Sequence, residues 1–309
     1  MDLESTLISM VARSLAFSTP LLWAALGEIY AERSGVVNLG VEGMMILGAI
    51  SGFIVTQTTG SPLLGIAAAA LAGGLAALLH AFVSITLRAN QYISGLALTI
   101  LGLGLAGLFG RAYVGIPLAN PMQPVTVPGL SSLPIIGPAV FTNQYLLTYG
   151  GLIMALILSV LLFNSRLGVT IRSAGESPQA TDALGLNVFA VRYSCVVFGG
   201  VMAGIAGGYL SLAYRPAWTE GMTSGMGWIA LAIVIFASWR PVRAIGAAFV
   251  FGACFHLAFR LQESFPPEFL QMLPYLVTIL SLILLALGRG SRRAGAPAGL
   301  GEPYTRGER

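Results

Sequence analysis

Several side chains that could carry chemistry lie in one short segment between two apolar runs. Residues 27–48 contain four charged side chains and one asparagine: Glu28, Glu32, Arg33, Asn38 and Glu42. Asn38 and Glu42 are four residues apart, so on a helix they would share one face. A carboxylate inside a bilayer costs about 2.5–3.5 kcal/mol. Each such group must therefore line a wet cavity, pair with a cation such as Arg33, or lie at the membrane interface.

Two interpretations of this segment remain open. In the first, Glu28, Asn38 and Glu42 belong to a solute pathway or gate. A proton-coupled secondary transporter would then use Glu28 or Glu42 as its titrating group, although no internal inverted repeat is evident. In the second, the segment is an interfacial turn whose charges cap helix ends, with Glu42 near a helix start, where an anion is favoured.

The loop 164–193 carries sequence signals for a short helix. Ser177 is a favoured N-cap residue, Pro178 occupies the favoured first helical position, and Gly185 can end the helix after Leu184. These signals predict a helix of one to two turns between two apolar runs. Such a helix is suited to docking a soluble partner, and an ordinary amphipathic loop is the alternative.

A third segment carries small residues at helical spacing. Gly200, Gly204 and Gly208 recur every four residues, which lets two helix backbones approach closely and indicates packing without chemistry. The sequence has no HExxH, no GxSxG with an acid and a base, and no EF-hand loop. We therefore expect no catalytic residue and no metal site.

The composition defines the class of protein that must position these segments. Of 309 residues, 56% are hydrophobic and 9% are charged, whereas about a quarter of a soluble domain is charged. We expect an all-α, polytopic transmembrane bundle of about nine spans of about 20 residues each. The Gly-rich runs 36–58 and 92–112 could be broken or re-entrant. The expected spans are 6–27, 36–58, 63–87, 92–112, 145–163, 194–214, 225–239, 244–260 and 269–288.

The arginines indicate the orientation, because basic residues concentrate on the cytoplasmic side. They place the loop 164–193 in the cytoplasm and the Pro-rich loop 113–144 outside, with the N-terminus outside and the C-terminus inside. Residues 1–288 then form the membrane domain, and 289–309 form an arginine-rich tail that we expect to be disordered. The basic residues are few and lie next to the membrane, which argues against nucleic acid as a partner. All sixteen basic residues are arginine, so no P-loop lysine is present.

Two signature segments carry a family resemblance that covers about residues 5–288. The segments GEIYAERSGVVNLGVEGMM and RSAGESPQATDALGLNV, with the Gly-rich span after them, resemble the permease subunits of ABC importers. The similar branch comprises the branched-chain amino acid, ribose and nucleoside permeases, and within it the simple-sugar and nucleoside uptake systems.

The resemblance implies an all-helical subunit of a bacterial cytoplasmic (inner) membrane. It would pair with a second homologous permease, two cytoplasmic ABC ATPases and an extracytoplasmic solute-binding protein. ATP and Mg would be bound by the ATPase, and this chain would hold no cofactor. The implied solute is a nucleoside, then a simple sugar, then a branched-chain amino acid. The resemblance assigns the coupling to the ATPase to one element with these recognisable positions: Gly175, Glu176, Ser177, Pro178, Asp182 and Gly185.

Overall fold

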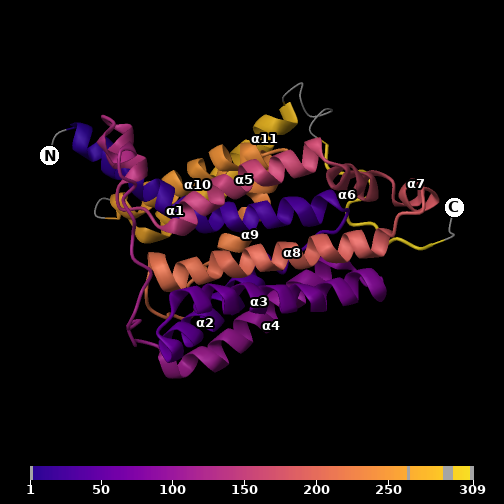
Figure 1. Cartoon of the computed structure of the whole chain (residues 1–309), viewed down its shortest axis with the longest axis horizontal. Helices are drawn as coiled ribbons and strands as arrows, with labels where there is room; N and C mark the ends of the chain where they lie inside the picture. Colours follow the sequence, from indigo (N-terminus) through magenta and orange to yellow (C-terminus); the bar gives the residue numbers. More distant parts are fainter. Residues whose placement is uncertain (1–2, 263–264, 288–294, 307–309) are drawn as a thin grey trace.

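The computed structural model describes residues 3–262, 265–287 and 295–306. Within them the chain is an elongated bundle of helices, with isolated bridges in place of strands, so the predicted all-α fold is confirmed (Figure 1). The helices are α1 (Leu3–Arg33), α2 (Val41–Thr59), α3 (Pro62–Ala81), α4 (Gln91–Gly110), α5 (Leu146–Asn164), α6 (Arg166–Glu176), α7 (Pro178–Ala183), α8 (Val188–Tyr209), α9 (Met226–Phe236), α10 (Pro241–Leu261) and α11 (Pro267–Leu287).

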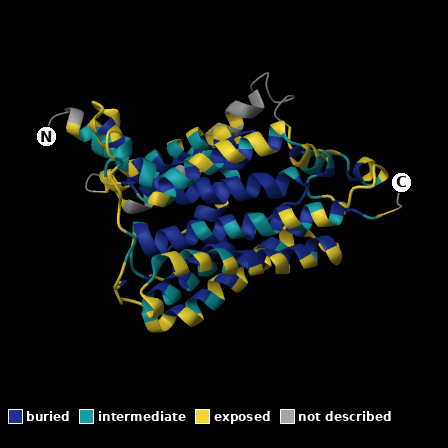
Figure 2. Ribbon diagram, in the orientation of Figure 1, coloured by how far each residue is buried: buried dark blue, intermediate teal, exposed yellow. Residues whose placement is uncertain are grey.

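Burial divides these helices into a centre and a periphery. Figure 2 shows α1 and α8 mostly buried, whereas the outer faces of α3, α4 and α5 are exposed. The exposed side chains on those outer faces are large and apolar, as on Leu71, Ile100 and Ile157. A surface of this kind is stable against lipid and not against water. Seven helices in the described residues are long and apolar enough to cross a membrane.

The expectation of a full span at 225–239 is wrong. The helix there, α9, has 11 residues, which is roughly 16 Å at the rise of an α-helix, and a bilayer core is about 30 Å thick. Residues 215–225 before it form no regular helix. This part of the chain therefore runs through the bundle as an irregular segment followed by a half-length helix.

The two Gly-rich runs and the last expected span agree with the structure to different degrees. The run 36–58 becomes helical only at Val41, after a non-helical segment at 34–40, whereas 92–112 is continuous helix. The last expected span corresponds to α11, and its final residue, 288, lies outside the described residues.

The two ends of the bundle carry different segments. Figure 1 places the start of α1 at one end and α6, α7 and the C-terminal residues at the other. The loop 113–144 lies at the first end, where the amide of Leu118 donates to the carbonyl of Pro216 (3.0 Å). The predicted separation of the loops 113–144 and 164–193 is thus present. The assignment of the α6–α7 end to the cytoplasm stays a prediction.

Three glycines bring α8 into close contact with α3. A Cβ atom at Gly204 would lie 2.1 Å from the carbonyl oxygen of Ala69, and one at Gly208 would lie 2.8 Å from the Cβ of Ala69. At Gly200 the added atom would lie 2.3 Å from the Cβ of Ala77. Only hydrogen fits at these positions, so the two backbones approach as small residues at this spacing allow.

Candidate functional site

The non-helical segment 34–40 is buried, and side chains satisfy its backbone. The amide of Asn38 donates to Glu28 Oε1 (3.1 Å), and the amide of Val37 donates to Gln91 Oε1 (2.8 Å). His80 Nε2 lies 3.1 Å from the carbonyl oxygen of Val37. Irregular backbone at membrane depth is stable only when its polar groups find such partners within the protein. Glu28 thus supports the break between α1 and α2.

Glu42 joins the start of α2 to the start of α9. Its Oε1 accepts hydrogen bonds from the hydroxyl of Thr223 (2.5 Å) and the amide of Gly225 (2.9 Å), and its Oε2 accepts one from the amide of Gly227 (2.7 Å). Amides at a helix N-terminus lack partners within the helix and favour an anion. The carboxylate of Glu42, a residue of α2, therefore caps the N-terminus of α9.

The three residues considered for the pathway are engaged within the chain. Glu28, Asn38 and Glu42 are 1%, 0% and 3% exposed, and the structure brings the first two together. Within the described residues, only Oε2 of Glu28 among their carboxylate oxygens lacks a hydrogen-bond partner. These contacts favour the structural interpretation and do not favour the proton-coupled carrier. A role of these residues in the pathway stays a prediction.

The ion pair considered for Arg33 is absent from the described residues. Its Nε instead donates to the carbonyl of Trp239 (3.2 Å), and its Nη2 donates to the carbonyl of Ser238 (3.4 Å). Glu32 accepts a hydrogen bond from the indole of Trp239. Both charged residues therefore attach the end of α1 to the turn between α9 and α10.

The predicted short helix is present as α7. The hydroxyl of Ser177 accepts a hydrogen bond from the amide of Ala180 (3.4 Å), and Pro178 is the first helical residue. The helix ends at Ala183, one residue earlier than expected, and Gly185 follows with φ +79°. Helix α6, which precedes it, was not expected. Local capping signals identified α7 because its ends are specified by neighbouring residues.

Helix α7 projects from the end of the bundle but is closely attached to it (Figure 1). Pro178 and Thr181 are buried, whereas the side chain of Leu184 is 76% exposed. At the α6–α7 junction, a Cβ atom on Gly175 would lie 2.2 Å from the carbonyl oxygen of Arg33. The junction thus rests directly on the end of α1, with no side chain between the two backbones.

The expectation of a disordered tail does not hold for residues 295–306. The amide of Gly299 donates to the carbonyl of Gly175 (2.8 Å), and the amide of Gly301 donates to the carbonyl of Gly35 (3.1 Å). These contacts hold the tail between the α6–α7 junction and the break after α1. The rest of the predicted tail, 289–294 and 307–309, lies outside the described residues.

Side chains add to the attachment of the tail. The side chain of Tyr304 is 5% exposed and packs in a small cluster with Ala174 and Val188. The buried Arg192 donates from Nη1 to the carbonyl oxygen of Glu302 (2.9 Å). Composition alone missed this part of the site because the contacts that attach the tail to the bundle are with residues distant in sequence.

A comparison with known protein families shows which family the chain belongs to. Residues 10–282 match the family described as branched-chain amino acid transport system / permease component. The chain belongs to this family. The resemblance found in the sequence is therefore confirmed.

Three relatives extend over almost the whole chain. A candidate glucose ABC transporter permease protein of Haloferax volcanii is 39% identical, over 94% of this chain and 95% of the relative. The guanosine ABC transporter permease protein NupQ of Bacillus subtilis is 35% identical over 100% of both chains. The nucleoside ABC transporter permease protein NupC of Lactococcus lactis is 35% identical over 98% of this chain and 99% of the relative.

Proposed function

We propose that this permease is the membrane subunit of an ATP-driven importer for nucleosides or simple sugars. Family membership supports the transport role, and the exposed helix α7 at one end of the bundle carries the proposal of ATPase coupling. Nucleosides are the first candidate because two of the three relatives are named for guanosine or nucleosides. Simple sugars follow, because the third is named for glucose, and branched-chain amino acids come last.

The partners follow from the same proposal. A second homologous permease completes the solute pathway, an extracytoplasmic protein delivers the solute, and two cytoplasmic ATPases bind ATP and Mg. The chain itself catalyses no reaction, and its α7 docks on an ATPase through the exposed side around Leu184. We place this assembly in the cytoplasmic membrane with α7 inside.

Coupling requires that movement of α7 reaches the membrane helices. The α6–α7 junction touches the carbonyl oxygen of Arg33 at the end of α1 through Gly175. Beyond Arg33, the break at 34–40 leads into α2, which Glu42 attaches to α9. ATPase closure would therefore shift α1, α2 and α9 together. It can do so only if the ATPase binds α7 with different affinity in its open and closed states.

The test is purification of the chain from its native membrane, followed by transport in proteoliposomes. We expect an ABC ATPase and a second permease to co-purify. The reconstituted complex, supplied with its binding protein, should take up labelled guanosine or glucose only with ATP on the α7 side. ADP in place of ATP is the control. Uptake driven by a pH gradient without ATP would contradict the proposal, as would a chain that purifies without an ATPase.

A further inference from the structure

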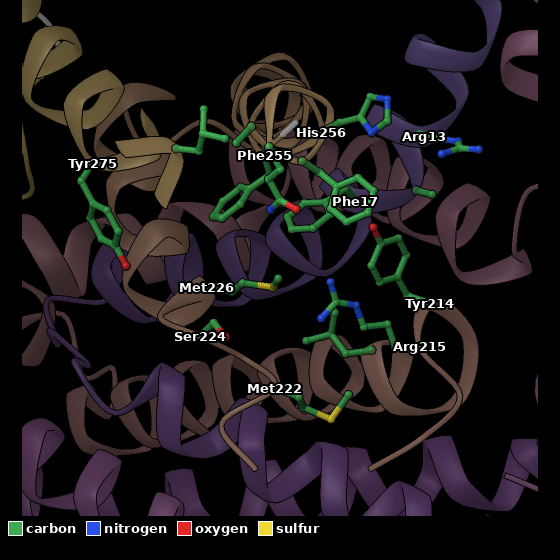
Figure 3. Close-up of a pocket in the computed structure, with 16 residues that line it drawn as sticks. Arg13, Phe17, Tyr214, Arg215, Met222, Ser224, Met226, Phe255, His256 and Tyr275 are labelled. Carbon is green, nitrogen blue, oxygen red and sulfur yellow. The ribbon is translucent and has the colours of Figure 1, made fainter. Parts of the chain in front are cut away.

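A cavity opens at the end of the bundle opposite α7. Its volume is about 630 Å³, within the range of roughly 300–1,000 Å³ typical of small-molecule sites. Figure 3 shows side chains from α1, from the residues that follow α8, and from α10 and α11 around one space. Among the lining residues are Phe17, Phe255, Tyr214, Arg13 and Arg215.

The cavity lies beside the part of the chain where a helix is missing. Met222, Ser224 and Met226 line it, and they belong to the irregular segment and the first residue of α9. A regular helix through 215–225 would fill space with its own side chains and satisfy its own backbone. Non-helical backbone at membrane depth is otherwise found where it lines a cavity or is buried in protein. The irregular segment that interrupts this membrane crossing therefore also forms part of the cavity wall.

Aromatic rings form one wall of the cavity. The rings of Phe17 and Phe255 are stacked with centroids 4.7 Å apart, and Tyr214 meets Phe17 edge-on at 5.4 Å. Phe17 comes from α1 and Phe255 from α10, so two helices present adjoining ring surfaces. Such surfaces favour a planar, aromatic ligand, which gains stacking energy in addition to area burial.

Two of the side chains that line the cavity are arginines. Of the residues that the structure describes, Arg13 and Arg215 line the cavity, no carboxylate does, and neither arginine forms an ion pair. Arginine donates hydrogen bonds and accepts none. The cavity therefore suits a ring with carbonyl acceptors, such as the O6 and N7 edge of guanine, which arginine contacts with two parallel bonds. A hexose has no planar aromatic ring to stack on this wall.

We propose that this cavity is a solute site within the subunit that binds an oxo-substituted nucleobase, as in guanosine, inosine or uridine. The base lies against Phe17 and Phe255, and its carbonyl edge accepts hydrogen bonds from Arg215. The proposal rests on the proposed function and selects nucleosides over sugars. Solute released by the binding protein would occupy this site before it moves toward the α7 end.

Equilibrium binding of labelled guanosine to the purified full complex tests the site directly. The variant Arg215→Gln should weaken binding at least tenfold, and Phe255→Leu should weaken it severalfold. Arg243→Gln is the matched control, because Arg243 is an exposed arginine at the opposite end of α10. Adenosine, whose base presents an amino group in place of O6, should bind more weakly than guanosine, and glucose should not compete. Equal binding by parent and Arg215→Gln complexes would overturn the site.

A second measurement changes a lining residue only from a hydroxyl to a thiol. Ser224→Cys places a thiol in the cavity wall, and the parent chain, with Cys195 and Cys254, gives the background labelling. Guanosine should slow maleimide labelling of the new thiol, and glucose should not. Protection by glucose alone would overturn the nucleobase assignment. If guanosine were taken up with ATP but did not protect the thiol from maleimide, the cavity would not be the solute site, and the proposed function would stand. If neither solute were taken up with ATP, the proposed function would be wrong.

Discussion

The guanidinium of Arg306 lies 3.2 Å from the carboxylate of Asp182, so the end of the chain touches the helix that we assign to ATPase docking. The side chain of Arg306 is 76% exposed, and an exposed pair of this kind contributes about 0–1 kcal/mol. The attachment of the tail therefore depends mainly on the buried Tyr304 and the backbone contacts at Gly299 and Gly301.

Deletion of residues 295–309 should loosen the α6–α7 junction. The carbonyls of Gly175 and Gly35 would lose their partners, and Ala174 would become exposed. We expect faster hydrogen exchange at 175–186 and reduced ATP-dependent uptake, with normal insertion into the membrane. Arg306→Gln alone is the control and should change neither, because its ion pair is exposed. Unchanged exchange at 175–186 after the deletion would show that the tail does not hold α7.

Charge reversal at Asp182 should uncouple transport from ATP hydrolysis. Asp182→Arg places a cation beside Arg306, at the contact between α7 and the tail. Uptake should fall at least tenfold, while the amount of the chain in the membrane stays unchanged. Glu176→Arg should have a similar effect, since Glu176 also contacts the tail, through the amide of Ala298 (3.2 Å).

Glu220→Arg provides the matched control for these reversals. Glu220 is an exposed carboxylate in the irregular segment before α9, so its reversal changes the net charge equally and leaves α7 intact. Uptake should remain near the parent level. If Asp182→Arg were instead lost from the membrane, its effect would be on folding, and the coupling role would lose its support.

The sequence predicted the elements whose signals are local. The apolar runs located the long helices because about 20 apolar residues are sufficient to specify a membrane helix. Ser177, Pro178 and Gly185 located α7 to within one residue, since each acts on backbone groups of its immediate neighbours. The glycine spacing on α8 likewise indicated a face for close packing.

Features that depend on distant residues could not be read in the same way. The run 225–239 is as apolar as a span, yet α9 has only 11 residues and ends at Phe236, and Glu42 from another helix supplies acceptors at its start. The tail has the composition of a disordered segment, and its order comes from partners such as Gly175 and Gly35. The cavity residues Arg13 and Arg215 are isolated in apolar sequence, so no spacing links them.

Replacement of Glu42 by glutamine should destabilise the chain. Three donors converge on its carboxylate, from Thr223, Gly225 and Gly227. An amide supplies one acceptor oxygen, and its NH₂ group would face a donor, so at least one buried group loses its partner. We expect a loss of about 1–3 kcal/mol, seen as a lower apparent melting temperature in detergent. A variant with unchanged stability and a shifted pH profile of uptake would instead favour the proton-coupled carrier.

Gly204 offers the sharpest test of the contact between α8 and α3. In Gly204→Ala the new methyl group would lie 2.1 Å from the carbonyl oxygen of Ala69, so the two helices must separate. Overpacking of this kind costs about 1–3 kcal/mol, and the apparent melting temperature should fall. Gly104→Ala is the matched control, because a Cβ atom there meets open space on α4 and alanine has the higher helix propensity. Equal melting temperatures for the two variants would mean that α8 and α3 are not held in the close contact described.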